Sequence, residues 1–123
     1  MRDIKFRSWN KVNKTMYDNS IYNCKDSFDM QLKHPQIYEV MQYIGLEDKN
    51  GRKIYEGDII TITLDTGNVI TGSVGMNNGQ WSIKYYDRYY SLVSIWYDMQ
   101  PEVIGNIYEN SELLERNEDE IDG

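Results

Sequence analysis

Length, composition and charge set the first limits on this chain. Its 123 residues fit one domain, since domains usually hold ~100–200 residues, and 40% of the residues are hydrophobic, which is enough for one core. The formal net charge of −7 repels phosphate backbones at long range, whereas a general nucleic-acid binder of this size is usually basic. Composition therefore disfavours general nucleic-acid binding.

No export or membrane signal is visible in the sequence. Cys24 is the single cysteine, which excludes an internal disulfide and gives no indication of an oxidising compartment. Residues 1–7 lack the apolar run of a signal peptide, and no stretch approaches the ~20 apolar residues of a membrane span. We therefore expect a cytoplasmic protein with no membrane partner.

The two ends of the chain carry opposite charge. Residues 1–14 hold five cations against one carboxylate, and residues 109–122 hold seven carboxylates against one cation. An acidic tail can bind a basic partner, mimic nucleic acid or stay solvated. The simplest expectation is that the two ends attract each other, within a chain or between copies.

The N-terminal part predicts a β-hairpin and a loop. Residues 4–9 alternate in polarity, polar residues 10–14 follow, and residues 15–17 continue as a second strand. Residues 18–36 show no sustained period, which predicts a loop or a short irregular insertion. From residue 36 onward β-forming residues return, and an Asn50-Gly51 turn is expected to close a second hairpin.

Residues 58–85 predict a three-stranded meander. Three alternating segments are separated by turns at residues 65–68 and 77–79, and Gly72 allows a bend or a close approach of two backbones. The predicted core consists of the residues on one face of these strands and of a later one: Ile60, Ile62, Leu64, Ile70, Val74, Trp81, Ile83 and Ile107.

The C-terminal segment predicts one more strand and a short helix. Residues 90–99 fit neither a strand nor a helix well, and both remain open. Residues 103–109 alternate as a strand, and Asn110 or Ser111 is expected to cap a helix that runs through Leu114. The acidic residues 117–123 cannot bury enough apolar surface to order themselves.

These elements predict a mainly β fold. We expect a small SH3-like barrel in the C-terminal two-thirds, with an N-terminal β-hairpin extension and a short C-terminal helix; a five-stranded OB-like barrel is the alternative. Residues 1–123 are expected to form a single domain. Within it, residues 1–45 are the extension and loop, residues 46–116 the barrel and helix, and residues 117–123 the acidic tail.

Three segments together resemble the YopX family of small phage and prophage proteins. They are MRDIKFRSWN at residues 1–10, MQYIGLEDKNGRKIYEGDII at residues 41–60, and VIGNIYENSELL at residues 103–114. The resemblance implies a phage or prophage origin, hence the cytoplasm of a host cell, an SH3-like barrel in the C-terminal part, and self-association. It implies no activity and no site residues.

The residues that could support catalysis favour a structural interpretation. His34, the only histidine, precedes Pro35 in the predicted loop, and no second ligand lies at metal-binding spacing. Asp48, Glu56 and Asp58 lie around turns, where carboxylates usually accept backbone amides. We expect no catalytic residues, no metal site and no cofactor.

One segment suggests a binding surface. Residues 84–90 interleave tyrosines with cations at an expected hairpin, and the candidate surface residues are Lys84, Tyr86, Arg88 and Tyr89. Exposed tyrosine and arginine suit a protein interface, so we expect a homo-oligomer, a host or phage protein partner, or both. The alternative is single-stranded nucleic acid, whose bases stack on aromatic rings. That alternative gains weight only if Lys5, Arg7 and Lys11 fold onto the same surface.

Overall fold

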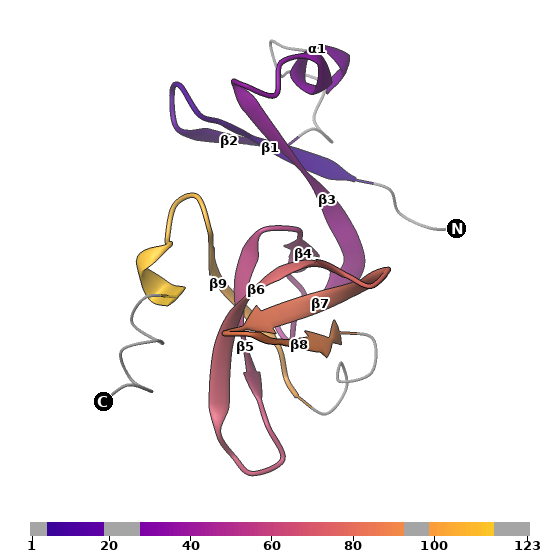
Figure 1. Ribbon diagram of the computed structural model, residues 1–123, viewed down its shortest axis with the longest axis vertical. Coiled ribbons are helices and arrows are strands. Elements are labelled where there is room, and N and C mark those ends of the chain that lie inside the picture. The colour runs from indigo at the N-terminus through magenta and orange to yellow at the C-terminus, as the bar shows by residue number, and fades with distance from the viewer. Residues whose placement is uncertain (1–4, 19–27, 93–98, 115–123) are drawn as a thin grey trace.

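The computed structural model describes residues 5–18, 28–92 and 99–114, which form a mainly β protein (Figure 1). Two sheets account for its strands, with the orders β2-β1-β3-β4 and β8-β7-β6-β5-β9. Within those described ranges, no helix has the length and apolar character needed to cross a bilayer. The predicted fold class is confirmed.

The first sheet contains the predicted N-terminal hairpin. Its strands are β1 (Phe6–Asn10), β2 (Thr15–Asp18), β3 (Tyr38–Glu47) and β4 (Lys53–Tyr55), and neighbouring strands pair antiparallel. The Asn10 side-chain oxygen accepts the backbone amides of Val12 and Asn13, which fixes the turn between β1 and β2. The long strand β3 pairs with β1 at its start and with β4 at its end.

A short helix lies where the sequence predicted a loop or irregular insertion. Helix α1 (Phe28–Lys33) has six residues, too few to display a helical period, which is why the pattern missed it. It is tied to β1 because the Ser8 hydroxyl donates a buried hydrogen bond of 2.9 Å to the Gln31 side-chain oxygen. A tertiary contact therefore supports a helix too short to be stable alone.

The second sheet curls into an open half-barrel (Figure 1). Its strands are β5 (Asp58–Thr63), β6 (Val69–Asn77), β7 (Gln80–Tyr85), β8 (Arg88–Ser91) and β9 (Glu102–Asn106). β5, β6 and β7 form the predicted meander, and β8 and β9 are the two outer strands of the sheet. Residues 93–98, most of the segment left open by the sequence, lie outside the described residues.

Two glycines have the roles expected of them. Gly51 has a φ of +82°, the left-handed conformation that the turn between β3 and β4 requires. Gly72 lies where β6 approaches β7 so closely that an added Cβ would collide with the Lys84 carbonyl oxygen. The predicted turn and the predicted close approach are both confirmed.

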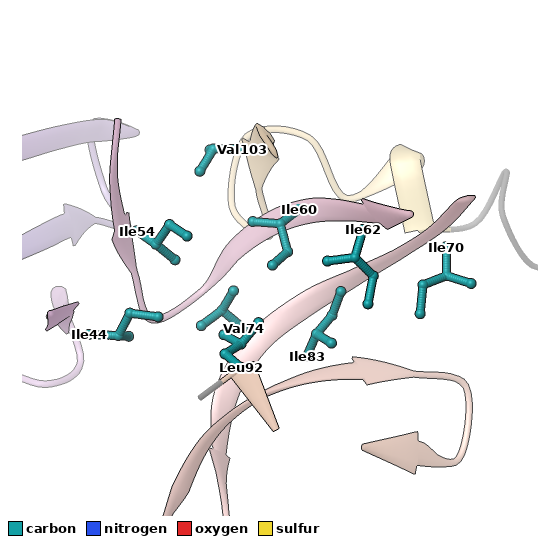
Figure 2. Packing of buried hydrophobic residues seen from close by; sticks show 9 residues of the cluster. All are labelled: Ile44, Ile54, Ile60, Ile62, Ile70, Val74, Ile83, Leu92 and Val103. Carbon is teal, nitrogen blue, oxygen red and sulfur yellow. The ribbon is translucent and has the colours of Figure 1, made fainter. Parts of the chain in front are cut away.

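The core lies between the curled sheet and the β3–β4 hairpin. Figure 2 shows the buried cluster, made of Ile44, Ile54, Ile60, Ile62, Ile70, Val74, Ile83, Leu92 and Val103. Ile60 and Ile62 are 0% and 1% exposed, whereas Thr63 is exposed, so the predicted register of β5 is confirmed. Leu64 and Trp81 are only half-buried and pack against the cluster.

The prediction that Ile107 belongs to the core was wrong, since its side chain is 37% exposed. β9 ends at Asn106 because the Asn106 side-chain oxygen accepts the backbone amides of Tyr108 and Glu109 and turns the chain away. The predicted short C-terminal helix begins at residues 112–114, where the Leu113 amide donates to the Asn110 carbonyl.

Candidate functional site

The candidate surface lies on the β7–β8 hairpin. Lys84 pairs with Tyr89 across the two strands, and Tyr85 pairs with Arg88. Tyr86 and Asp87 form the two-residue connection, in which Tyr86 adopts a φ of +56°. The hairpin predicted from the tyrosine-rich segment is therefore present.

The structure brings only two of the four predicted surface residues together. Side chains alternate between the faces of a strand, and Tyr85 packs against the core cluster, so its cross-strand partner Arg88 projects from the same face as Tyr85, although it is exposed there. Lys84 and Tyr89 lie on the opposite, outer face; Lys84 is exposed and Tyr89 is 48% exposed. We call Lys84 and Tyr89 the outer-face pair.

Tyr86 is engaged within its own hairpin. Its ring meets the ring of Tyr85 edge to face, with centroids 4.6 Å apart and an interplanar angle of 80°. This geometry is a favourable arrangement for an aromatic pair. The Tyr86 ring therefore has an aromatic partner within its own hairpin.

The outer-face pair lies next to the edge of the sheet. Tyr89 belongs to β8, the last strand on one side of the second sheet among the described residues. At the other edge, two backbone amides of β9 donate hydrogen bonds to side chains: that of Val103 to Asp48 and that of Asn106 to Asn110. Edge strands present backbone groups that can pair with another chain, and such side-chain acceptors limit this pairing at β9.

Two of the N-terminal cations, Arg7 and Lys11, are engaged with partners in the first sheet and at its junction with the second. Arg7 is 9% exposed and forms a buried ion pair with Asp58, so it cannot serve as a surface cation. Lys11 pairs with Glu39 at 2.8 Å and donates to the Pro35 carbonyl at 3.0 Å. The arrangement that would have favoured nucleic-acid binding is absent for these two residues.

A buried ion pair joins the two sheets. The Arg7 Nη2 atom on β1 lies 2.6 Å from Oδ1 of Asp58 on β5, and the other oxygen of Asp58 accepts the Tyr55 amide at 2.8 Å. The guanidinium also lies over the Tyr55 ring, 4.7 Å from its centroid. Arg7 Nε is buried and finds no hydrogen-bond partner among the described residues.

The environment of Asp58 opposes its charge. Burial raises the pKa of Asp58 above its ordinary value, although the Arg7 guanidinium and the Tyr55 amide act in the opposite direction. The Asp58 side chain is 1% exposed and that of Arg7 is 11% exposed, so each charge is stabilised mainly by the other and little by water. We interpret the pair as a structural connection, because its known partners lie within the fold.

A second contact between the sheets lies beside the ion pair. The rings of Trp9 on β1 and Tyr108 after β9 are stacked, with centroids 5.7 Å apart. Burial raises the pKa of Tyr108, and nearby Glu39 and Glu56 raise it further. Residues 1–10, 41–60 and 103–114, the three segments that carry the family resemblance, thus contribute to one junction.

The predicted role of a turn carboxylate is confirmed for Asp48. Asp48 accepts the backbone amides of Asn50, Arg52 and Val103 at 2.9–3.0 Å, which ties the β3–β4 turn to β9. Burial alone would raise the pKa of Asp48, but these hydrogen bonds outweigh it and hold the pKa below its ordinary value. The Asp48 carboxylate therefore stabilises the β3–β4 turn.

Metal ligation finds no support in the described ranges, which contain no group of three or more His, Cys, Asp or Glu side chains suited to a metal ion. His34 lies in the turn after α1, where its backbone amide donates to the Gln31 carbonyl and its ring lies 3.5 Å from the Gln36 amide nitrogen. Cys24 lies outside the described residues.

Comparison with known proteins gives one family and similar chains among the solved structures. The profile of the YopX protein family matches residues 5–115. Protein EF1440 from Enterococcus faecalis is similar at 27% identity and a TM-score of 0.62, over 93% of this chain and 99% of that one. Protein YopX from Bacillus subtilis is similar in fold, with 19% identity and a TM-score of 0.51, over 89% and 97%. Among curated proteins, none matches.

Proposed function

Because the chain belongs to the YopX protein family, we propose that it is a phage- or prophage-encoded protein without enzymatic activity that acts by binding protein. Its first partner is a second copy of itself, and a host or phage protein is a further partner. It acts in the cytoplasm of the host cell. The outer face of the β7–β8 hairpin carries the contact.

The outer-face pair is the observation that supports this proposal. An aromatic side chain that is 48% exposed lies next to an exposed cation, on the outermost strand that the structure describes on this side of the sheet. This combination has three features of protein-binding surfaces. The ring supplies contact area, the cation supplies orientation, and the strand edge supplies backbone groups for pairing. A specific contact built around it should bury about 1,000 Å² or more in total.

Single-stranded nucleic acid is the weaker candidate partner. Among residues 80–91 of the β7–β8 hairpin, Lys84 is the one cation on the outer face with Tyr89, and the ring of Tyr86 is paired with Tyr85. Arg7, which could have strengthened the local positive field, is buried in its ion pair. A chain with a net charge of −7 needs more than one surface cation to hold a phosphate backbone.

Sedimentation equilibrium at micromolar concentration tests the proposal. We expect a reversible oligomer, and Tyr89→Ala should weaken its association by about 30-fold or more, the effect at the lower threshold of an interface hot spot. Leu32→Ala is the matched control, because Leu32 is a 53% exposed apolar residue of α1, outside the second sheet, and its substitution should leave association unchanged. Equal thermal stability of the two variants would show that the fold is intact.

Two results would overturn the proposal. A wild-type protein that stays monomeric across this range removes the self-association, and an oligomer that tolerates Tyr89→Ala removes the surface. Binding of a single-stranded oligonucleotide that falls with salt and is lost in Lys84→Ala would favour the nucleic-acid alternative. We expect no such binding.

A further inference from the structure

The edge strand β8 directs some of its backbone hydrogen-bonding groups away from the sheet. In the order β8-β7-β6-β5-β9, the described part of the chain gives β8 one neighbouring strand, β7. Successive residues of a strand turn their amides and carbonyls to opposite sides, so every second residue of an edge strand points away from the sheet. The turns on either side of β7 determine which residues of β8 do so.

The turn between β6 and β7 determines which residues of β7 bond to β8. Its two residues, Asn78 and Gly79, have φ values of +52° and +78°, as in a tight hairpin turn whose flanking residues exchange backbone hydrogen bonds. Counting from Gln80, the even-numbered residues of β7 therefore bond to β6, and the odd-numbered residues up to Tyr85 bond to β8.

The turn between β7 and β8 leads to the same assignment. Its two-residue connection closes Tyr85 and Arg88 as a hydrogen-bonded pair, so Arg88 and Tyr90 bond to β7. Tyr89 lies between them, and its amide and carbonyl point to the outer edge of β8. Tyr89 thus offers a half-exposed ring on the outer face and two backbone groups at the edge.

A second copy of the same edge is the partner that fits these groups. At the opposite edge, the β9 amides of Val103 and Asn106 donate to side chains, which hinders head-to-tail pairing of β8 with β9 of another copy. Pairing of β8 with β8 uses one surface twice and closes as a dimer. We propose that two copies join β8 to β8 as an antiparallel pair about a two-fold axis, which makes their curled sheets continuous. This inference rests on the self-association proposed above and specifies its geometry.

The faces and charges of β8 select one register. A shift by one residue would place core-facing side chains opposite outer ones, so residues of the same face must lie opposite each other. The register with Tyr89 opposite Tyr89 of the second copy exchanges two backbone hydrogen bonds and sets the two rings side by side. It also places Arg88 opposite Tyr90, a cation beside an aromatic ring, on both sides of the axis. A shift by two residues in one direction opposes the two Arg88 cations, and in the other it separates the two Tyr89 rings.

The positive charge of the outer-face pair is compatible with this dimer. Lys84 lies opposite Tyr89 on the neighbouring strand, so the Lys84 residues of the two copies are three strand spacings apart, about 14 Å. The Debye length at physiological salt is about 8 Å, so their repulsion is largely screened. A pair of four-residue strands buries little area alone, and the two Tyr89 rings add to it toward the ~1,000 Å² of a specific contact.

Disulfide cross-linking between two variants tests the pairing and its register. In a Cys24→Ser background, one variant carries Arg88→Cys and the other Tyr90→Cys, and both keep the outer-face pair. Residues 88 and 90 of opposite copies form a pair without backbone hydrogen bonds, with Cα atoms about 4.5 Å apart, which a disulfide spans. Equivalent residues, 88 with 88 or 90 with 90, lie about 8 Å apart, which is too far. With oxidised glutathione, the equimolar mixture should form about tenfold more disulfide dimer than either variant alone.

A matched cysteine control and a proline variant separate edge pairing from other contacts. In the control mixture Thr63→Cys replaces Tyr90→Cys, because Thr63 is exposed on an interior strand of the sheet and should give only background cross-linking. Tyr89→Pro removes the outward amide as well as the ring, so it should weaken association about fivefold or more beyond Tyr89→Ala. Its thermal stability should match that of Tyr89→Ala, because an amide that points outward makes no bond to β7. Each cysteine variant is first checked for a native circular dichroism spectrum.

The outcomes separate this inference from the proposed function. A mixture without extra disulfide dimer, equal cross-linking in the Thr63→Cys control, or dimers from Tyr90→Cys alone overturns the proposed β8–β8 pairing. If Tyr89→Ala still abolishes association while the mixture shows no extra dimer, the outer-face proposal stands without the edge pairing. If the mixture cross-links as expected and association survives Tyr89→Ala unchanged, the edge pairing stands and the outer-face proposal fails.

Discussion

Neutralising Asp58 should destabilise the protein more than any other single polar substitution at the junction of the two sheets. Asp58→Asn keeps an oxygen that can accept the Tyr55 amide but removes the charge that faces Arg7 at 2.6 Å. An arginine stays protonated in proteins, and the Arg7 side chain is only 11% exposed. Breaking a buried ion pair on one side costs ~3–5 kcal/mol, and we expect a loss in that range.

A double-mutant cycle isolates the interaction. Arg7→Met removes the cation but keeps an apolar side chain of similar length, and the double variant with Asp58→Asn removes both charges. The double variant should be more stable than Asp58→Asn alone, because no uncompensated charge remains buried. Urea unfolding followed by tryptophan fluorescence gives the free energies of unfolding at pH 7.

The pH dependence of Arg7→Met adds an independent check. Without the cation, the pKa of Asp58 rises further above its ordinary value, and the folded state then favours the protonated carboxyl. The free energy of unfolding of Arg7→Met should therefore be lowest at pH values above this raised pKa. It should increase as the pH falls through the raised pKa and the carboxyl becomes protonated. Two results would refute the buried pair as the connection between the sheets: a loss below ~1 kcal/mol for Asp58→Asn, or single-variant losses whose sum equals the loss in the double variant.

Three further predictions concern the barrel and its turns. Ile62→Ala should lower the free energy of unfolding by ~2–5 kcal/mol, and Thr63→Ala by ~0.5 kcal/mol or less, in the same urea assay; equal effects would contradict the register of β5. Gly51→Val should lower the free energy of unfolding by ~1–3 kcal/mol, because Gly51 has a φ of +82°, and it should leave association constants unchanged. A variant that keeps its full stability but loses association would contradict this structural role. The lowered pKa of Asp48 adds stability above its unfolded-state pKa of ~3.8, which is lost as the pH falls through the lowered value. Asp48→Asn should flatten that acid dependence in circular dichroism, and an unchanged acid midpoint would argue against the hydrogen bonds to Val103 and the turn.

Several strands of the barrel could be predicted because their side chains alternate in burial along the strand. Ile60, Ile62 and the intervening threonine show this alternation directly, and the Asn50-Gly51 dipeptide marks its turn through the conformational freedom of glycine. These signals are local, so one sequence is enough to read them. Helix α1 was missed because its six residues are held by a contact from Ser8, which is distant in sequence.

The candidate site was predicted only in part. The tyrosine-rich hairpin followed from composition, but which side chains share a face depends on the cross-strand register, and this register separates Arg88 from Lys84. Arg7 looked like one of several N-terminal surface cations. Its burial against Asp58 depends on pairing between residues 51 positions apart, for which no local pattern exists.

Hydrogen–deuterium exchange as a function of protein concentration tests the central claim most directly. If copies of the protein associate through the outer-face pair, the backbone amides of residues 84–91 should exchange more slowly at high protein concentration than at low concentration. Tyr89→Ala should remove this difference, while amides in the core strand β5 exchange equally slowly throughout. Association without added protection at residues 84–91, or protection that survives Tyr89→Ala, would contradict the proposed surface.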